Sequence, residues 1–429
     1  MTTIGFAGLS HLGIVSSVAA ADQGFSVVGF DSDSSLCEQL SRGVLPIQEP
    51  GLVELLEQVS ERISFTAFVE DLGSCELVYL SLDVDTDDTG RSDLDRLRLL
   101  MEQVMPTLRP GCTIVILSQV PPGFTRMMAA HHQLQISKRN YVLYYQVETL
   151  IFGRAVERAQ RPERFILGSH NPGDLSPPLA EFLGTFGCPI LPMKYESAEL
   201  TKISINMFLA ISVSMSNCLA ELCESVGADW SEITPALRLD RRIGEHAYLA
   251  PGLGIAGGNL ERDLVSVVSM AREYGTDSDI VTSVIENSRY RRDWVLRQLH
   301  RMLPVPSEST IALWGLAYKV DTKSTKNAPS LALVAALPGS CIRAYDPAVD
   351  PVDVPEEVVR GTSPLDACHG ADVLVVMTPW EEFRHVDLGK VRQGMKGDLI
   401  IDPFGLIESD HCAENGLKHR RIGVATEEA

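Results

Sequence analysis

The first thirty residues constrain the fold of this chain more than any other segment. Residues 3–8 form a short apolar run, residues 9–23 have the small and apolar side chains of a helix that packs on a sheet, and residues 25–31 are a second apolar run. Gly24 ends the helical pattern, as glycine often does at a helix C-terminus. A strand, a helix and a second strand in this order predict a βαβ unit within a parallel sheet.

The turn between the first strand and the helix reads GLSHLG, with Gly8 and Gly13 at its ends and Ser10 in the middle. Dinucleotide-binding folds have a third glycine at that middle position, where the main chain approaches a pyrophosphate, and serine is small enough to keep binding plausible. Asp31 lies 23 residues after Gly8, close to the spacing of the acidic residue that binds the ribose 2′-hydroxyl and repels a 2′-phosphate. We therefore expect NAD rather than NADP, bound by Gly8, Ser10, His11, Leu12, Gly13 and Asp31.

Strand-like and helical patterns continue along the chain. The segment from Tyr195 to about Val226 has apolar residues at helical spacing and neither Pro nor Gly, which predicts one long helix. Helical patterns extend to about residue 303 and a short linker follows. Strand-like runs occur before the long helix at residues 76–82, 112–118 and 141–147, and after the linker at residues 341–347, 371–378 and 398–404.

These patterns predict an α/β fold with two Rossmann-like open parallel sheets, joined by a long central helix and a helical middle region. A length of 429 residues fits two or three domains. We expect an N-terminal NAD-binding domain over residues 1–195, a central helical region over residues 196–303, and a second α/β domain over residues 304–429.

Charge and cysteine content exclude several classes of function. The formal net charge of −20 argues against binding the phosphate backbone of a nucleic acid. The nine cysteines show no paired spacing and no CxxC pattern, and the histidines do not accompany them at ligand spacing, so we expect no metal site. Cys218 and Cys223 lie five residues apart on a helical pattern and are predicted to be buried thiols.

The N-terminus and the apolar segments indicate where in the cell the protein is expected to be. The chain opens with Met-Thr-Thr and enters an apolar strand directly, without a basic region or a cleavage site. No apolar stretch is recognised that reaches the roughly 20 residues of a membrane span. We therefore expect a cytoplasmic protein without a membrane partner.

Four runs occur in the order and spacing typical of one enzyme family: residues 202–210, 241–263, 315–319 and 345–347. On these runs the chain resembles the UDP-glucose/GDP-mannose dehydrogenase family over roughly residues 2–405. The resemblance implies NAD as cofactor and a nucleotide sugar as substrate, with UDP preferred over GDP. It also implies a sugar-nucleotide-binding role for the C-terminal domain, and a homodimer whose interface includes the central helix.

The resemblance also implies catalytic residues. Lys202 and Asn206 match a lysine and an asparagine beside the reacting carbon of the sugar, and their spacing of four places them on one helical face. Together they would stabilise the oxyanion that develops as an alcohol becomes a carbonyl. Asp263 matches an aspartate that holds a water or acts as a base. The alternatives are a lysine on a solvated face and an aspartate that only caps a helix.

Further matches concern the substrate and the cofactor. Arg242 matches an arginine that reaches the sugar nucleotide of the partner subunit, and a glycine-rich loop would cover the uridine and diphosphate. Lys319 and Lys326 of the C-terminal domain could each instead be a surface charge without a binding role. The substrate residues implied are Arg242, Tyr248, Gly252, Gly254, Gly257 and Lys319, and the additional cofactor residues are Ser118, Gln119 and Lys326.

Three positions depart from the family pattern. Asn259 occupies the place of the cysteine that carries the substrate covalently, and an amide cannot replace a thiolate nucleophile. Gln119 replaces a threonine. Of two family glutamates the first is kept as Glu148, whereas the second, which assists thioester hydrolysis, is Phe152. All three changes belong to the second oxidation and the hydrolytic step.

The departures favour a two-electron oxidation of the sugar C6 hydroxyl to the aldehyde level, with Lys202, Asn206 and Asp263 retained for a single hydride transfer. Three alternatives stay open: a complete four-electron dehydrogenase that oxidises the aldehyde hydrate without a covalent intermediate, a catalytically silent homologue that binds a nucleotide sugar, and a lyase or epimerase that returns the hydride.

A separate acidic loop carries Asp83, Asp85, Asp87 and Asp88, and its spacing does not fit an EF-hand calcium site.

Overall fold

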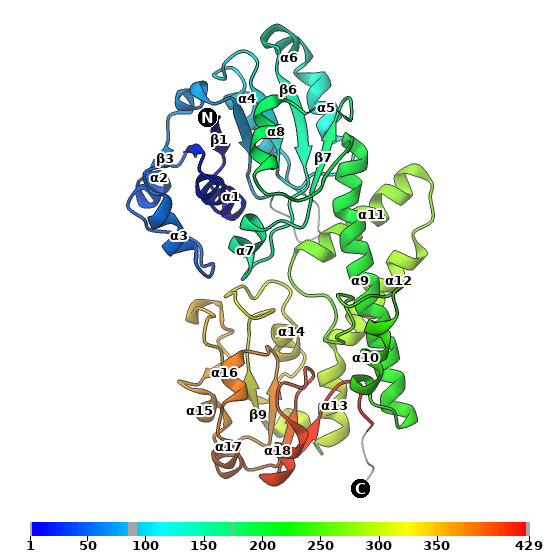
Figure 1. Ribbon diagram of the computed structural model, residues 1–429. Helices are drawn as coiled ribbons and strands as arrows, with labels where there is room; N and C mark the ends of the chain where they lie inside the picture. Colours follow the sequence, from blue (N-terminus) through cyan, green and yellow to red (C-terminus); the bar gives the residue numbers. More distant parts are fainter. Residues whose placement is uncertain (1, 85–91, 174, 426–429) are drawn as a thin grey trace. The chain divides into compact units, whose positions relative to one another are not determined.

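The computed structural model describes residues 2–84, 92–173 and 175–425 (Figure 1), with the side chain of Asn259 outside the described atoms. The chain divides into two compact units, Met1–Ile205 and Asn206–Ala429. The predicted α/β class with two open, mostly parallel sheets and a helical middle region is confirmed.

The first unit has an eight-stranded sheet in the order β3-β2-β1-β4-β5-β6-β7-β8. Five of these strands coincide with the apolar runs of the sequence. β3, β7 and β8 are additional, and they are less regularly apolar. The strands are β1 (Thr3–Ala7), β2 (Ser26–Phe30), β3 (Ile63–Thr66), β4 (Leu77–Leu80), β5 (Thr113–Ile116), β6 (Val142–Gln146), β7 (Phe165–Ser169) and β8 (Ile190–Lys194).

One strand pair departs from the expected parallel arrangement, because β6 and β7 are antiparallel. A parallel connection must carry the chain back along the whole strand, which usually requires a substantial crossover helix. The connection here contains only α7 (Ala155–Gln160), whose six residues span about 9 Å, less than the roughly 16 Å of a five-residue strand. The loop that begins after β6 therefore stays at the carboxyl end of the sheet.

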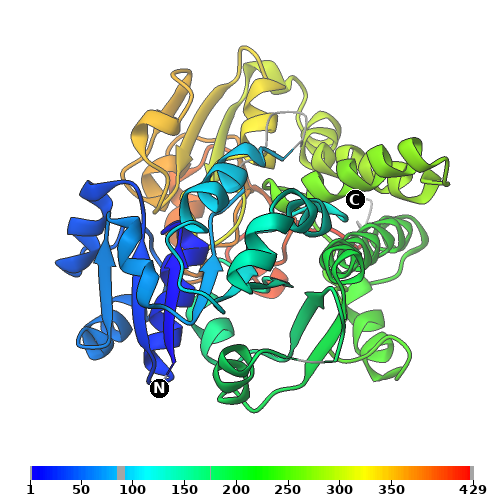
Figure 2. The ribbon, with the colours of Figure 1, turned by 90° about the horizontal axis from the view of Figure 1, so that it is seen from above.

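Helices cover both faces of the first sheet (Figures 1 and 2), and each face has its own apolar core. Ile4, Phe6, Ile14 and Val18 are buried in the core beneath the βαβ opening. One face packs against α1 (His11–Asp22), α2 (Ser34–Ser41), α3 (Leu52–Val59), α7 and α8 (Pro177–Gly184), and the other against η1 (Val69–Ser74), α4 (Asp95–Val104), α5 (Phe124–His131) and α6 (Gln133–Arg139).

The second unit has a six-stranded, fully parallel sheet in the order β11-β10-β9-β12-β13-β14. Its strands are β9 (Thr310–Trp314), β10 (Cys341–Tyr345), β11 (Val358–Arg360), β12 (Val373–Val376), β13 (Leu399–Ile401) and β14 (Lys418–Arg420). Its helices are α10 (Trp230–Leu239), α11 (Asn259–Tyr274), α12 (Asp279–Arg292), α13 (Trp294–Met302), α14 (Pro329–Ala335), α15 (Pro364–Cys368), α16 (Glu381–Arg384), α17 (Leu388–Gly394) and α18 (Ser409–Glu414), with short 3₁₀ turns η2 (Pro306–Glu308) and η3 (Pro351–Asp353).

The predicted long helix is α9 (Tyr195–Val226), and the boundary between the two units falls within it. The sequence contains no charged residue between Lys202 and Glu221. By length and composition alone α9 would suffice to cross a membrane, with a mean hydropathy of 1.5 over its most apolar 18 residues, 44% of which are buried. The expectation that no such stretch exists was therefore wrong. One helix of this kind is weak evidence of a span, because core helices of globular proteins share the property.

Of the two cysteines predicted to be buried on this helix, Cys223 is buried and Cys218 is exposed. The prediction for Cys218 was wrong because the helix turns that residue away from the core. The Nδ2 of Asn287 lies 3.2 Å from the Cys218 sulfur.

Candidate active site

Loops at the carboxyl ends of five parallel strands carry many of the predicted residues of the first unit. β1, β2, β4, β5 and β6 run parallel to one another, so the loops that follow them meet at one edge of the sheet. Ligands of open α/β sheets bind at this edge. The residues that follow the five strands include Gly8, Asp31, Asp83, Ser118 and Glu148.

The two glycines of the first turn are required by its geometry. Gly8 has φ of +91°, and a Cβ there would lie 3.1 Å from backbone and side-chain atoms of Leu82. A Cβ on Gly13 would lie 1.9 Å from the carbonyl oxygen of Gly8. The turn therefore brings strand and helix together as closely as a dinucleotide-binding turn demands.

Ser10 uses its hydroxyl within the protein. Its Oγ donates to the carbonyl oxygen of Ser81 at 3.1 Å and accepts from the backbone N–H of Asp83 at 2.8 Å. The Oγ of Ser118, in the loop after β5, donates to the carbonyl oxygen of Leu82 at 2.6 Å and so holds the same loop. The predicted cofactor residues Ser10 and Ser118 thus shape the edge through the backbone, while Gln119 is half-buried in the turn after β5.

Asp31 lies directly after β2 and accepts from the backbone N–H of Leu9 at 2.8 Å and of Asp33 at 3.0 Å. Each carboxylate oxygen has capacity for a second hydrogen bond, which suits a ribose diol. At the N-terminus of α1, the backbone N–H of Leu12 points toward an Asp83 carboxylate oxygen at 3.4 Å. The Gly8 and Gly13 geometry, the α1 N-terminus and Asp31 together fit the pyrophosphate and ribose of NAD.

Lys202 is held by Glu148. Its Nζ donates to the Glu148 carbonyl oxygen at 2.9 Å and lies 3.3 Å from a Glu148 carboxylate oxygen. The two side chains are 14% and 18% exposed, so the alternative of a lysine on a solvated face is wrong. A charged pair of this kind, partly withdrawn from water, fixes the orientation of the ammonium.

Asn206 and Asp263 form a buried pair in the second unit. The Nδ2 of Asn206 donates to an Asp263 carboxylate oxygen at 2.5 Å, and the Nε of Arg262 lies 3.2 Å from the other oxygen. Asp263 is in the second turn of α11, whose N-cap is Gly258, so the alternative that Asp263 caps the helix is wrong. Asn259 is the first residue of α11. That Asn259 takes the place of the family's catalytic cysteine stays a prediction.

The glycine-rich loop of residues 251–258 is fixed by polar groups from two helices. Asn217 on α9 accepts from the Gly252 N–H at 2.7 Å, and Ser288 on α12 accepts from the Ile255 N–H through its Oγ at 2.7 Å. Gly254 and Gly257 have φ of +79° and +77°. A Cβ would lie 2.3 Å from the Ser288 carbonyl oxygen at Gly254, and 2.8 Å from the Tyr318 ring at Gly257.

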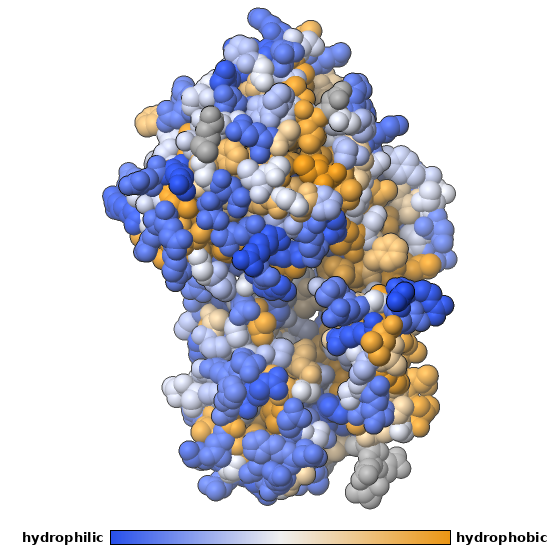
Figure 3. Space-filling view, viewed as in Figure 1, coloured by the Kyte–Doolittle hydropathy of each residue, from blue (hydrophilic) through white to orange (hydrophobic). Residues whose placement is uncertain are grey.

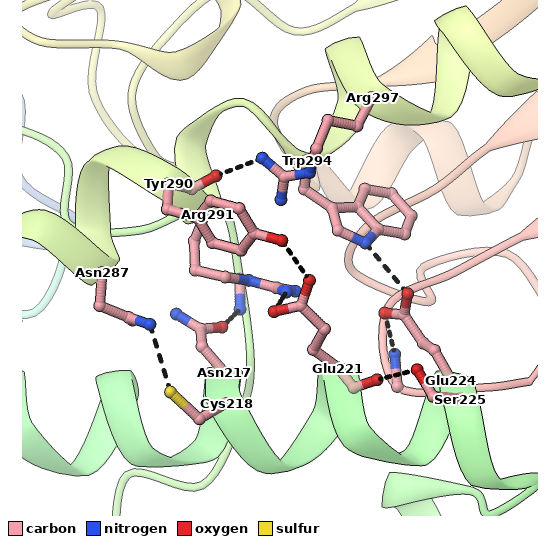
Figure 4. A network of polar contacts seen from close by, with 12 residues as sticks. Asn217, Cys218, Glu221, Glu224, Ser225, Asn287, Tyr290, Arg291, Trp294 and Arg297 are labelled. Carbon is pink, nitrogen blue, oxygen red and sulfur yellow. Dashed lines mark hydrogen bonds and ion pairs between the residues drawn. The ribbon is translucent and has the colours of Figure 1, made fainter.

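Figure 4 shows polar contacts that join α9 to α12 and α13. Tyr290 donates to Glu221 at 2.7 Å, and Arg291, whose side chain is fully buried, lies 3.1 Å from the other Glu221 oxygen. Trp294 reaches Glu224 at 3.3 Å. The two Glu221 contacts hold α9, which carries Asn217, to α12, which carries Ser288, so they set the position of the loop indirectly.

The predicted cations of the second unit occupy three different settings. Arg242 is 89% exposed in its side chain and pairs with Asp240, which lowers the pKa of that carboxyl through their hydrogen bonds; Tyr248 is also exposed. Lys326 lies beside the N-terminus of α11, because a Cβ on Gly258 would meet its Cε at 3.3 Å. Lys319 has its Nζ 5.9 Å from the centroid of the Tyr318 ring.

Comparison with known proteins accounts for this arrangement. Three domain models of the UDP-glucose/GDP-mannose dehydrogenase family match: the NAD binding domain at residues 2–178, the central domain at residues 196–289 and the UDP binding domain at residues 312–409. The UDP-glucose 6-dehydrogenase of Pseudomonas aeruginosa is 31% identical, over 97% of this chain and 96% of that protein. The chain belongs to the UDP-glucose/GDP-mannose dehydrogenase family.

Other relatives agree. A UDP-glucose 6-dehydrogenase of Bacillus subtilis is 29% identical over 99% of this chain and 93% of that protein. A UDP-D-ManNAc dehydrogenase from Pyrococcus horikoshii superposes with a TM-score of 0.83 at 25% identity, covering 98% of this chain and 99% of that one. The fold is also that of a UDP-glucose dehydrogenase from Pyrobaculum islandicum, with a TM-score of 0.87 at 23% identity, covering 99% and 98% of the two chains.

Family membership confirms the expected NAD-binding domain and places the protein among NAD-dependent nucleotide-sugar dehydrogenases. The UDP binding domain supports a UDP-sugar as substrate. Asp85, Asp87 and Asp88 of the acidic loop lie outside the described residues. Among the residues that the structure describes, no cluster of three or more His, Cys, Asp or Glu side chains is arranged to hold a metal ion.

Several residues that shape the site were not predicted from the sequence. Asn217 and Ser288 hold the glycine-rich loop, and Glu199 on α9 is completely buried and accepts from the backbone N–H of Gly123 and of Thr125 at 2.6 and 2.8 Å. Burial raises the pKa of Glu199 despite these bonds. The available signal was a polar residue within an apolar helical pattern, but the pattern does not reveal its distant partner.

Proposed function

We propose that this member of the family oxidises the C6 hydroxyl of a UDP-sugar to the aldehyde level and releases the product there. The supporting observation is that the groups needed for one hydride transfer are held in defined positions, Lys202 by Glu148 and Asp263 by Asn206. Asn259 and Phe152, by contrast, replace the two residues that relatives need for the later half of the reaction.

The oxidation converts a primary alcohol into an aldehyde, a hydride and a proton. Gly8, Gly13 and Asp31 would hold NAD at this edge, where the cofactor would supply the hydride acceptor. The Asp263 carboxylate accepts the hydroxyl proton, directly or through a water. Lys202 and Asn206, one turn apart on α9, donate to the oxygen as negative charge develops on it.

Release at the aldehyde level follows from the side chains present. A thioester requires a thiolate that attacks the aldehyde carbon, and the carboxamide of Asn259 is not a nucleophile of this kind. Phe152 carries no group that could activate a water for hydrolysis. Its ring instead lies against His11, with centroids 4.3 Å apart.

We infer further that the protein is a homodimer through α9. From residue 206 onward, five large apolar side chains on this helix are exposed: Phe208, Met215, Leu219, Leu222 and Val226, at 75%, 57%, 39%, 55% and 65%. Their spacing of 7, 4, 3 and 4 residues places them on one face. Apolar surface gathers over the part of the second unit where α9 and α10 lie (Figure 3), and a second copy of this face would cover it.

The decisive experiment measures NADH formed per mole of sugar nucleotide consumed, together with the mass of the product, across UDP-, GDP- and dTDP-sugars. The proposal expects one NADH and an aldehyde or its hydrate. Two NADH with a uronate would establish the four-electron alternative. A changed sugar without net NADH would indicate a lyase or epimerase, and no reaction with any sugar nucleotide would indicate a silent homologue.

A pair of variants sharpens the test. Asn259→Cys restores a thiol, and adding Phe152→Glu restores the carboxylate that relatives use for hydrolysis. The double variant is expected to move the ratio from one toward two, and Asn259→Cys alone to accumulate a covalent adduct detectable by mass spectrometry. A wild-type ratio of two would overturn the proposal before either variant is needed.

A further inference from the structure

Glu49 is a buried carboxylate at the edge of the first sheet, in the loop before α3. Its side chain is 1% exposed, and the Nε2 of His11 lies 2.8 Å from its Oε1. It also accepts from the backbone N–H of Gly153 at 3.0 Å and of Ala155 at 3.1 Å. Because a carboxylate only accepts hydrogen bonds, the His11–Glu49 bond needs the ring tautomer that has its hydrogen on Nε2.

These contacts join two parts of the proposed site. His11 is the first residue of α1, at the helix end predicted to receive the pyrophosphate. Gly153 and Ala155 close the loop that starts with Glu148, the partner of Lys202. The loop is therefore held at its beginning by Lys202 and at its end by Glu49, and Glu49 holds it to the N-terminus of α1.

Two further contacts connect the same elements. The His11 ring lies against the Phe152 ring, tilted by 40°, so the middle of the loop also touches α1. The Asp83 carboxylate, which faces the N–H of Leu12, interacts electrostatically with both His11 and Glu148. A structural change at the N-terminus of α1 can therefore alter the Glu148 loop, because side chains such as His11 contact both elements.

We propose that Glu49, acting through His11, is a positioning residue that couples cofactor binding at the N-terminus of α1 to the conformation of the loop carrying Glu148. The inference rests on the proposed function for the place of the cofactor. Under this proposal, a cofactor bound at the N-terminus of α1 favours the loop conformation that presents Glu148 to Lys202. Loss of the His11–Glu49 bond separates the two events while leaving each element folded.

Two substitutions at position 11 separate the hydrogen bond from the ring contact. His11→Phe keeps an aromatic ring against Phe152 but has no donor for Glu49, whereas His11→Gln keeps a donor at the position of Nε2 and loses the ring. Glu49→Gln removes the charge. Glu54→Gln on α3 is the matched control, because Glu54 is exposed and lies in the next element of the chain.

The measurement is hydrogen exchange of the amides of residues 148–155 in the full protein, with and without saturating NADH, alongside NADH affinity from fluorescence. In the wild type and in Glu54→Gln, NADH is expected to slow exchange in this loop as well as in α1. In His11→Phe and Glu49→Gln, NADH should still protect α1 but not the loop. Affinity should fall about threefold to tenfold, a loss within the range of one typical hydrogen bond.

His11→Gln should recover most of the loop protection, because it restores the donor. Equal NADH protection of the loop in His11→Phe and in the wild type would overturn the proposal, and so would failure of His11→Gln to recover it. The outcomes are distinct from those of the proposed function. Intact coupling without any turnover would refute the reaction alone, and normal turnover without coupling would refute the positioning role alone.

Discussion

Asp31 and Asp346 occupy equivalent positions in the two sheets. Each follows the second strand of its βαβ unit and accepts from the backbone N–H of the residue after the glycine of the first turn, Leu9 at 2.8 Å and Leu316 at 2.6 Å. Asp346 accepts in addition from the N–H of Ala317, Ala348 and Val349 and from the Nε1 of Trp380. The second sheet therefore repeats the geometry of a dinucleotide turn but uses its carboxylate within the protein.

The two aspartates should consequently respond differently to substitution. Asp31→Ala is expected to weaken NADH binding by about tenfold to a hundredfold, equivalent to one hydrogen bond to a charged group. It should also lower the free energy of unfolding by about 1–3 kcal/mol, because the N–H of buried Leu9 loses its acceptor. Asp346→Asn should leave NADH affinity unchanged and lower the free energy of unfolding by about 2–4 kcal/mol, because an amide NH₂ would face buried N–H donors. Fluorescence titration and denaturant unfolding measure the two quantities. Equal effects of both substitutions on affinity would contradict this division.

The sequence predicted the elements whose signal is local. The βαβ opening and α9 were recognised because an apolar run, or an apolar period without Pro and Gly, reports directly on burial. β8 was missed because its residues Ile190–Lys194 are half exposed at the sheet edge and include Pro192. Among candidate site residues, Lys202 and Asp263 were proposed through motifs, whereas Glu49 and Asn217 act on partners 104 and 35 residues away. No short-range pattern encodes such pairs.

The Lys202–Glu148 pair predicts a selective loss of chemistry. Lys202→Met removes the ammonium that would stabilise the developing oxyanion, so kcat/KM for the sugar nucleotide should fall by about a thousandfold. NADH affinity should change by less than about threefold, because the dinucleotide residues are untouched. Lys194→Met is the control, since Lys194 is exposed at the end of β8. An equal loss of activity in both variants would show that Lys202 acts only through general charge.

Glu199 predicts a specific dependence of stability on pH. Burial raises its pKa above the ordinary value of 4.5, so its ionised form is disfavoured in the folded state. The resulting loss of stability is absent below pH 4.5, grows as pH rises through the window above it, and is complete above the folded-state pKa.

Glu199→Gln removes this titration. The difference in unfolding free energy, variant minus wild type, should therefore shift in favour of the variant between pH 4.5 and 8, by about 1.4 kcal/mol for each unit of pKa shift. Urea unfolding at several pH values measures it, with Glu196→Gln as a partly exposed comparison on the same helix. A difference that does not vary with pH would show that Glu199 titrates alike in the folded and unfolded chain.

The exposed face of α9 predicts dimerisation that a single charge disrupts. Phe208 is 75% exposed, so Phe208→Asp should leave the unfolding free energy of the monomer within about 0.5 kcal/mol while placing a charge in the interface. Light scattering after size exclusion should show a dimer for the wild type and a monomer for the variant. Because Arg242 is proposed to contact the sugar nucleotide of the partner subunit, the monomeric variant should also lose substrate affinity, whereas NADH binding stays. A wild-type monomer with full activity would refute both the interface and the role of Arg242 across it.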